Sequence, residues 1–404
     1  MMFLAHRYIL ILALIACIAS LPACASAFQN HPLASSVSPI PTRSHAASSP
    51  TALSAASLPL QDCVCLVTGA SRGIGKGIAL ELGRAGATVY ITGTSTTGKP
   101  KGKQAKALYS TTDDTGGPGT IEETAQEISG MSSSAQGIPV YCNHADDNQV
   151  QQLMDTIQEN HGRLDILVNN VFRIPPGAPK TLLKPFWEQG AKTWDTVHTI
   201  GCRSHFVATC MAMPLLRKAQ ASPQSNMPRP LVAMISSFGG LSYSFNTPYG
   251  VAKAAVDRMA KDMAVELEDD ICVASLYPGL VMTERTVRTK ESGEWDEFVQ
   301  LPLIDGLYES PQFTGQAIVA LATEQDNAKR SGTVQVVAEL ADEFSFDDVV
   351  TGWRAPSIRS LRFLLPTYGM SEDQRNKLSS LSSIPDWRLP FWVMAMGKPP
   401  TDDE

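Results

Sequence analysis

Acidic residues are absent from the first 61 residues of this 404-residue chain, which contain only two basic residues, Arg7 and Arg43. The rest of the chain therefore carries 31 Lys and Arg against 40 Asp and Glu, a formal charge of −9. Because contacts with nucleic-acid phosphates need clustered basic residues, this balance argues against nucleic acid as a partner. The uneven charge also distinguishes an N-terminal segment from the body of the protein.

The same segment lacks an apolar run of membrane-spanning length. "YILILALIACIASL" follows His6 and Arg7 and is 14 residues long, shorter than the roughly 20 residues that a transmembrane helix needs. Small residues at Ala25 and Ala27 then form a pattern that signal peptidase cleaves. We therefore expect a signal peptide over residues 1–27 and no firm membrane span in the mature chain; a membrane anchor is the alternative.

Residues 28–60 also contain no acids and are rich in Ser, Ala and Pro. This composition cannot bury a core and is typical of a transit peptide. The junction "ASAF", which ends at Phe28, resembles the presequences of algae with secondary plastids. We expect a plastid protein that travels through the secretory pathway; the alternative is an endoplasmic-reticulum or secreted protein with a disordered linker.

Cysteine spacing matches no common zinc pattern, so we expect no metal site. Six of the eight cysteines lie beyond residue 61: Cys63, Cys65, Cys142, Cys202, Cys210 and Cys272. Most of them fall within apolar runs, which favours buried free thiols over disulfides. His198 and His205 are expected to be packing or surface residues rather than ligands.

From Leu60 onward, short apolar runs alternate with amphipathic helical patterns. The runs that predict strands are "DCVCLVTGA", "TVYITG", "IPVYCN", "LDILVNN", "LVAMISS" and "CVASLYPG". This rhythm predicts a doubly wound α/β fold, a mostly parallel Rossmann sheet whose ligands bind beyond the carboxyl ends of the strands. We expect one domain over 61–345, with insertions at 95–119 and 284–312, and a C-terminal extension over 346–404.

"TGASRGIG" places Gly69, Gly73 and Gly75 between the first strand and the first helix. Glycines at this point let the backbone approach a pyrophosphate, which then lies at the helix N-terminus. A dinucleotide site is favoured over a plain tight turn, because the loop opens an α/β domain.

No carboxylate follows the second strand, where a site that prefers NAD usually offers one to the ribose. The strand ends in "YITGT", Arg72 lies in the glycine loop, and lysines occur at positions 99, 101, 103 and 106. These cations suit a 2′-phosphate, so we expect NADPH rather than NADH. The lysines could equally form a solvated loop, and Arg72 is the stronger candidate.

The stretch "NTPYGVAK" predicts the start of a helix. Thr247 can cap it, and Pro248 suits the first helical position. Tyr249 and Lys253 then share one face, where an ammonium can stabilise a phenolate. Ser237 ends the preceding strand, where its hydroxyl could hold a substrate carbonyl.

Taken together, these motifs resemble the classical short-chain dehydrogenase/reductases. "TGASRGIG", "NN" at 169–170, "ISS" at 235–237, "YGVAK" at 249–253 and "PGLVMT" at 278–283 occur in the family's order. The chain also resembles the dehydrogenase/reductase SDR family member 1 group in "VYITG", "FNTPYGVAKAA", "VALAT" and the C-terminal "IPDW".

The resemblance implies a role for each matching residue. Tyr249 would be the general acid, Lys253 would lower the pKa of Tyr249 and bind the nicotinamide ribose, and Ser237 would orient the carbonyl. Ser236 would be structural. The cofactor would contact Gly69, Ser71, Arg72, Gly73, Ile74, Gly75, Thr94, Asn143, Asn169, Tyr249, Lys253, Pro278, Gly279 and Thr283.

Five positions depart from the family pattern. Gly201 stands where the family has a fourth catalytic residue, an asparagine; its carbonyl could still hold a relay water, and glycine tolerates a helix kink. "NNVF" replaces "NNAG", which leaves less room near Val171 and Phe172. Asn143 replaces an acid beside the adenine, and Thr94 stands where the closer group has arginine.

The expected function is an NADPH-dependent carbonyl reductase, reversible as an alcohol dehydrogenase, that acts on a small-molecule ketone or aldehyde. One alternative is a 3-oxoacyl-thioester reductase of plastid lipid synthesis. An alternative of another class is a non-catalytic dinucleotide-binding sensor or scaffold. The family resemblance also implies a homo-oligomer.

Overall fold

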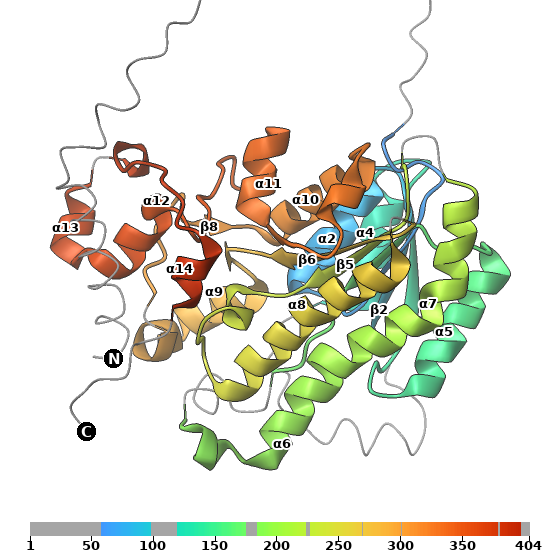
Figure 1. Cartoon of the computed structure of the whole chain (residues 1–404), viewed down its shortest axis with the longest axis horizontal. Helices are drawn as coiled ribbons and strands as arrows, with labels where there is room; N and C mark the ends of the chain where they lie inside the picture. The colour runs from blue at the N-terminus through green and yellow to red at the C-terminus, as the bar shows by residue number, and fades with distance from the viewer. Residues whose placement is uncertain are drawn as a thin grey trace, which may run out of the picture.

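The computed structural model describes residues 58–97, 119–174, 184–223 and 227–396, apart from 269, 300 and 379 (Figure 1). The predicted signal peptide, nearly all of the predicted transit segment, and the insertion lysines lie outside these residues. Leu60, the last residue of the transit-like segment, is fully buried in the core. No helix in the described part of the chain is long and apolar enough to cross a membrane.

Strands and helices alternate as the sequence predicts. The strands are β1 (Val64–Val67), β2 (Thr88–Gly93), β3 (Gln136–Tyr141), β4 (Ile166–Asn169), β5 (Leu231–Ile235), β6 (Cys272–Tyr277), β7 (Leu280–Val281), β8 (Tyr308–Glu309) and β9 (Val334–Val336). The helices are α2 (Gly73–Arg84), α4 (Ile121–Ser129), α5 (Asp147–Asn160), α6 (Phe186–His198), α7 (Ser204–Ala221), α8 (Thr247–Leu267), α9 (Glu284–Glu291), α10 (Pro311–Thr323), α11 (Val337–Phe344), α12 (Leu361–Leu364), α13 (Glu372–Asn376) and α14 (Phe391–Ala395). Short 3₁₀ or π segments are η1 (Thr199–Arg203), η2 (Phe238–Gly240), η3 (Trp295–Val299), η4 (Asn327–Arg330), η5 (Leu365–Gly369) and η6 (Leu381–Ser383).

Seven strands form one sheet in the order β3-β2-β1-β4-β5-β6-β9, and every neighbouring pair is parallel. The doubly wound Rossmann fold is thus confirmed. The order reverses between β1 and β4, which makes the carboxyl ends of these strands the expected ligand crevice. β7 and β8 form a separate parallel pair that the sequence did not predict.

The core lies on both faces of this sheet. Within β1, Cys65 and Val67 belong to one apolar cluster, whereas Val64 and Leu66 belong to the other. This alternation follows from the two-residue period of a strand. Helices α2, α4, α10 and α11 cover the first face, and α5, α7 and α8 cover the second (Figure 1).

All six cysteines in the described residues are free thiols. Cys63, Cys65, Cys142 and Cys272 are buried as expected. Cys202 is only partly buried and Cys210 is exposed, so the expectation of burial is wrong at these two positions. Cys210 is not among the buried residues of α7. No group of residues able to hold a metal ion occurs in the part of the chain that the structure describes.

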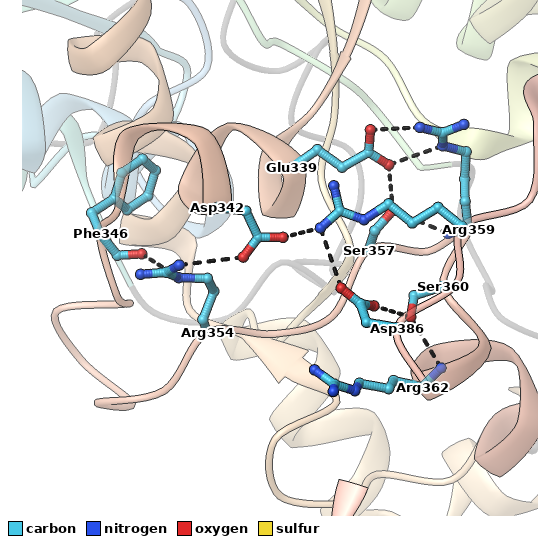
Figure 2. Close-up of polar contacts among 10 residues, drawn as sticks. Glu339, Asp342, Phe346, Arg354, Ser357, Arg359, Ser360, Arg362 and Asp386 are labelled. Atoms are coloured by element: carbon cyan, nitrogen blue, oxygen red, sulfur yellow. Dashed lines mark hydrogen bonds and ion pairs between the residues drawn. The ribbon is translucent and has the colours of Figure 1, made fainter. Parts of the chain in front are cut away.

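The described part of the C-terminal extension folds back onto α11 through ion pairs (Figure 2). Arg359 pairs with Glu339 at 2.6 Å, Arg354 lies 3.3 Å from Asp342, and Arg388 also pairs with Asp342. Phe363, Leu364 and Met394 of the extension join the apolar cluster on this face of the sheet. The extension therefore shares one core with the sheet domain.

Candidate active site

The three side chains predicted to act together meet at the carboxyl end of β5. Ser237 follows β5, and Tyr249 and Lys253 occupy successive turns of α8. The Tyr249 hydroxyl donates a hydrogen bond to Ser237 Oγ at 2.8 Å. Residues from a strand end and a helix start are thus joined by one short contact.

Asn246, rather than Thr247, caps the start of α8. Its side-chain oxygen accepts a hydrogen bond from the Tyr249 amide at 2.9 Å, and its backbone is extended. Thr247 is already the first helical residue, so the predicted cap is wrong by one position. Pro248 is the second helical residue rather than the predicted first, but it still lies in the first turn, where its missing amide hydrogen costs nothing. The cap fixes the position of the Tyr249 amide and therefore the backbone position from which the Tyr249 side chain extends.

Lys253 is 5% exposed, and its Nζ donates to the carbonyl oxygen of Ile235 at 2.9 Å. Burial lowers the pKa of Lys253 to about 8, although the Asp257 carboxylate on the same helix opposes this shift. Ser236 donates to the Lys253 carbonyl oxygen at 3.2 Å, which fits its predicted structural role. The lysine head is therefore held in a poorly hydrated position between α8 and β5.

Burial also raises the pKa of the Tyr249 phenol; its bond with Ser237 lowers that pKa and the Asp257 charge raises it. Phe172 and Phe245 each contact the Tyr249 ring edge to face, with centroids 5.7 and 5.2 Å away. Because these apolar rings surround the phenol, the effect of burial on the pKa of Tyr249 is larger than that of the Ser237 bond. That Lys253 lowers the pKa of Tyr249 stays a prediction.

The glycine loop depends on close backbone packing. Gly69 and Gly73 have positive φ angles of 69° and 59°, which residues with a Cβ atom rarely adopt. A Cβ atom at Gly75 would lie 2.3 Å from Asn170 Nδ2 and 2.4 Å from the carbonyl oxygen of Gly69. Lack of space therefore excludes a side chain at Gly75, and the backbone conformation disfavours one at Gly69 and Gly73.

Asn170 supports this loop, and the sequence reasoning missed it. Its Nδ2 donates to the carbonyl oxygens of Thr68 and Gly69 at 2.9 and 3.0 Å. Asn169 is fully buried and donates to Thr209 Oγ1 at 2.9 Å, in the centre of the sheet. Neighbouring residues at a strand end point to opposite faces of the sheet. The adjacent pair Asn169–Asn170 was therefore the sequence feature that could have indicated a second role for Asn170.

A carboxylate already binds an amide of the glycine loop. Glu284, the first residue of α9, accepts a hydrogen bond from the Gly73 amide at 2.9 Å. A cavity of about 500 Å³ adjoins this contact and is lined by Gly73, Lys76, Glu284, Arg288, Pro311 and Gln312, among others. The loop therefore accepts an anion at the start of α2, as a dinucleotide phosphate requires.

Arg72 lies against the chain that follows β2. Its Nη2 donates to Ser95 Oγ at 2.9 Å and to the carbonyl oxygen of Gly119 at 2.8 Å. Thr94 lies beside this contact in sequence, directly after β2. The Arg72 guanidinium therefore lies at the end of β2, where the adenosine ribose of a dinucleotide would bind.

The other predicted cofactor residues also lie at strand ends or on the loop. Ser71 is 9% exposed, and Ile74 packs partly against the core. Asn143 follows β3, is buried, and accepts a hydrogen bond from the Ala145 amide at 3.2 Å. Thr283 caps α9 by accepting from the Thr286 amide at 3.2 Å.

Pro278 and Gly279 follow β6, and Gly279 lies against a buried carboxyl group. A Cβ atom at Gly279 would stand 2.9 Å from Glu309 Oε2. Burial, opposed by a backbone hydrogen bond from Gly279 and aided by the charge of Asp348, raises the pKa of Glu309 to about 8. This acid, on β8, was not anticipated from the sequence, because it lies in the second insertion and reaches Gly279 only through the β7–β8 pairing.

The C-terminal extension braces the same strand. Asp348 accepts hydrogen bonds from both the amide and the hydroxyl of Ser310 at 2.6 Å, and Trp353 Nε1 donates to the Tyr308 carbonyl oxygen at 2.9 Å. The extension therefore supports the loop that follows β6.

Gly201 lies in the π-helical segment η1, an irregular turn between α6 and α7. His205 is buried, with Nε2 3.1 Å from the carbonyl oxygen of Val171, and burial lowers its pKa to about 3. His198 stacks on Trp194 at 3.8 Å. Both histidines pack, as expected.

Comparison with known proteins identifies relatives of this chain. The family model described as Enoyl-(Acyl carrier protein) reductase matches residues 104–337. Dehydrogenase/reductase SDR family member 1 of Mus musculus is 35% identical over 84% of this chain and 97% of its own length. The 3-oxoacyl-[acyl-carrier-protein] reductase FabG of Thermotoga maritima is 26% identical over 66% of this chain and 93% of its own length.

Among solved structures, a short-chain type dehydrogenase/reductase from Mycobacterium marinum matches with a TM-score of 0.52 and 22% identity, over 69% of this chain and 95% of that one. This likeness supports the fold. The family match and the mouse relative support more, because both cover the larger part of the chain. The chain belongs to the short-chain dehydrogenase/reductase family and is an oxidoreductase of the kind that uses a nicotinamide dinucleotide.

Proposed function

We propose that this protein is an NADPH-dependent carbonyl reductase, reversible as an alcohol dehydrogenase, and that Tyr249 is its general acid and base. The observation that carries the proposal is the 2.8 Å bond from the Tyr249 hydroxyl to Ser237 Oγ, with the buried ammonium of Lys253 one helical turn away. Tyrosine needs such help, because its ordinary pKa of about 10 makes it slow to exchange protons at neutral pH.

Each residue has one task in this scheme. Ser237 donates to the carbonyl oxygen of the substrate and orients it. Tyr249 protonates that oxygen as negative charge develops on it, and in the reverse direction it removes the alcohol proton. Lys253 offsets the charge of the phenolate. The nicotinamide, when bound, supplies the hydride.

The dinucleotide would be held by the glycine loop and the strand ends around it. Support comes from the anion contact at the Gly73 amide, which occupies a helix N-terminus suited to phosphate. NADPH is proposed over NADH because Arg72 stands at the end of β2 and no carboxylate occurs in "YITGT". A guanidinium there suits a 2′-phosphate.

Replacement of Tyr249 by Phe tests the proposal. We expect kcat for carbonyl reduction to fall by about 10²- to 10⁴-fold, the usual contribution of a positioned general acid. NADPH binding, followed by fluorescence titration, should stay within about twofold of wild type. A Tyr249→Phe protein that binds NADPH normally and reduces carbonyls at the wild-type rate would overturn the mechanism.

A 3-oxoacyl-thioester reductase is the second candidate. It is favoured by the relative from Thermotoga maritima, whose name states that reaction. The long insertions and the C-terminal extension of this chain argue that its substrate-binding side differs from that of compact family members that reduce 3-oxoacyl thioesters. Assay of steroid, retinoid, xenobiotic and acyl-thioester carbonyls with both cofactors separates the two functions by their kcat/KM values.

A non-catalytic sensor or scaffold is the candidate of another class. It predicts NADPH binding without turnover of any carbonyl. The intact contact between Ser237 and Tyr249 argues against it. Single-turnover oxidation of bound NADPH in the presence of the carbonyl panel distinguishes the two.

We further propose that the protein reaches a secondary plastid through the secretory pathway and forms a homo-oligomer. A fluorescent fusion to residues 1–60, with and without Phe28→Ala, tests the location: retention in the secretory pathway by the unaltered fusion would contradict it. Light scattering coupled to size exclusion tests the assembly, and a monomer mass would contradict it.

A further inference from the structure

Phe172 and Gly201 fit together beside the catalytic side chains. A Cβ atom placed at Gly201 would lie 2.5 Å from Phe172 Cδ2 and 2.7 Å from Cε2. Real Cβ atoms do not approach a ring so closely, so any side chain at position 201 would displace the phenylalanine. The ring therefore occupies the space into which a residue at position 201 would project.

The same ring contacts two of the three catalytic candidates. Lys253 Nζ lies 5.0 Å from the centroid of the Phe172 ring. Tyr249 meets that ring edge to face, at 5.7 Å and an interplanar angle of 89°. Phe172 is thus placed between Gly201 on one side and the lysine and tyrosine on the other.

An ammonium in this position gains from an aromatic face. Lys253 is 5% exposed, and its Nζ donates a hydrogen bond to the Ile235 carbonyl oxygen. The negative face of an aromatic ring attracts a cation, and the attraction grows as water is excluded. Phe172 therefore offsets part of the cost of burying this charge.

The other groups that face Lys253 come from three elements. Asp257 on α8 and the Cys202 thiol on η1 both raise the pKa of the lysine. Asp257 is itself bound by Ser275 Oγ and the Tyr277 hydroxyl, each at 2.5 Å. His205 on α7 is neutral near pH 7, because burial lowers its pKa to about 3.

We propose that Phe172 is a positioning residue of the proposed reaction: its ring keeps the Lys253 ammonium charged and close to Tyr249, in the space that Gly201 leaves free. Gly201 is small in this chain because the ring needs its space. Compared with the family pattern, this chain lacks a side chain at position 201 and has a ring at position 172. These two changes are then coupled. This inference rests on the proposed function.

A first experiment compares Phe172→Leu with Phe172→Tyr. Leucine fills similar space without an aromatic face, whereas tyrosine keeps the face. Loss of the cation–π contact should lower the pKa of Lys253, so the alkaline limb of the pH profile of kcat should move down by about half to one pH unit in Phe172→Leu. Phe172→Tyr should restore the wild-type profile. Equal profiles in all three proteins would overturn the inference.

The lysine pKa can also be measured without turnover. Titration of ¹³Cε-labelled lysine by NMR, with Lys253→Met to identify the signal, should show the same downward shift in Phe172→Leu. An unchanged Lys253 pKa would overturn the inference even if the enzyme is active. A Tyr249→Phe protein with full activity would instead overturn the proposed function, so the two failures are distinguishable.

A second experiment tests the coupling. Gly201→Asn alone should lower kcat by about 10-fold or more, because the new side chain displaces the ring. Phe172→Gly alone should also lower kcat. The double variant should be no less active than Phe172→Gly alone, since the ring is already absent and the asparagine then has room. If the two losses simply multiply, the residues are independent and the inference is wrong.

Discussion

The two sides of the site are built in opposite ways. The glycine loop is defined by missing side chains, because a Cβ atom at Gly75 would overlap Asn170 and the Gly69 carbonyl. The catalytic side is defined by bulky ones, with Phe172 and Phe245 against Tyr249. A backbone contact has no alternative arrangement, whereas neighbouring side chains can repack. We therefore expect the loop to tolerate no enlargement and the catalytic side to tolerate paired changes.

Gly75→Ala should be the most damaging change to cofactor binding. Overpacking of about 1–3 kcal/mol corresponds to roughly a 5- to 150-fold rise in the Kd for NADPH, measured by fluorescence titration. Gly130→Ala is the matched control, because a Cβ atom there meets its neighbours only at 3.5 Å and beyond. Unchanged Kd in Gly75→Ala would show that the loop repacks as freely as the catalytic side.

Arg72→Ala tests whether the loop side selects the 2′-phosphate. Hydrogen bonds to charged groups contribute about 1.5–3 kcal/mol, so the Kd for NADPH should rise by about 10-fold or more while the Kd for NADH changes less than about twofold. Arg84→Ala, at the other end of α2 where the side chain is half exposed, should affect neither. Equal losses for both cofactors would mean that Arg72 only supports the loop.

Acid should loosen both sides through buried imidazoles. His144 contacts Thr92 on the loop side, and burial lowers its pKa to about 4; the pKa of His205, on the catalytic side, is lowered to about 3. Between these values and about 6.5 the unfolded chain binds more protons, so stability falls as pH falls. We expect each histidine to reduce the free energy of unfolding by about 1 kcal/mol from pH 7.5 to 5.5.

Urea denaturation at both pH values measures this loss. The two histidines together cause a loss of unfolding free energy between pH 7.5 and 5.5. His144→Gln and His205→Gln should each remove about half of that loss. If the pH dependence is identical in both variants and in wild type, other groups produce it.

Glu284→Gln should have the smallest effect, and in the favourable direction. Removing the charge that binds the Gly73 amide leaves the loop more attractive to a phosphate, so the Kd for NADPH should fall by about threefold. Glu291→Gln, at the other end of α9, serves as the control. Weaker binding in Glu284→Gln would show that the carboxylate helps to build the site.

Most of the sheet could be predicted, because buried parallel strands read as apolar runs. "TVYITG" corresponds to β2 residue for residue. β9, a strand of three residues, and the two-residue strands β7 and β8 were missed, since runs this short carry no measurable period. The helix cap was misplaced by one residue, because asparagine and threonine both accept the same hydrogen bond.

The predictions of the glycine loop and of the Tyr249–Lys253 pair rested on local chemistry. The glycines between a strand and a helix, and the four-residue spacing of Tyr249 and Lys253, follow from backbone geometry within a few residues. Only the tertiary structure decided that Glu284 binds Gly73, that Asn170 holds the loop, and that Phe172 fills the space beside Gly201. Such contacts join different elements, and no periodicity along the chain encodes which side chains will meet across them.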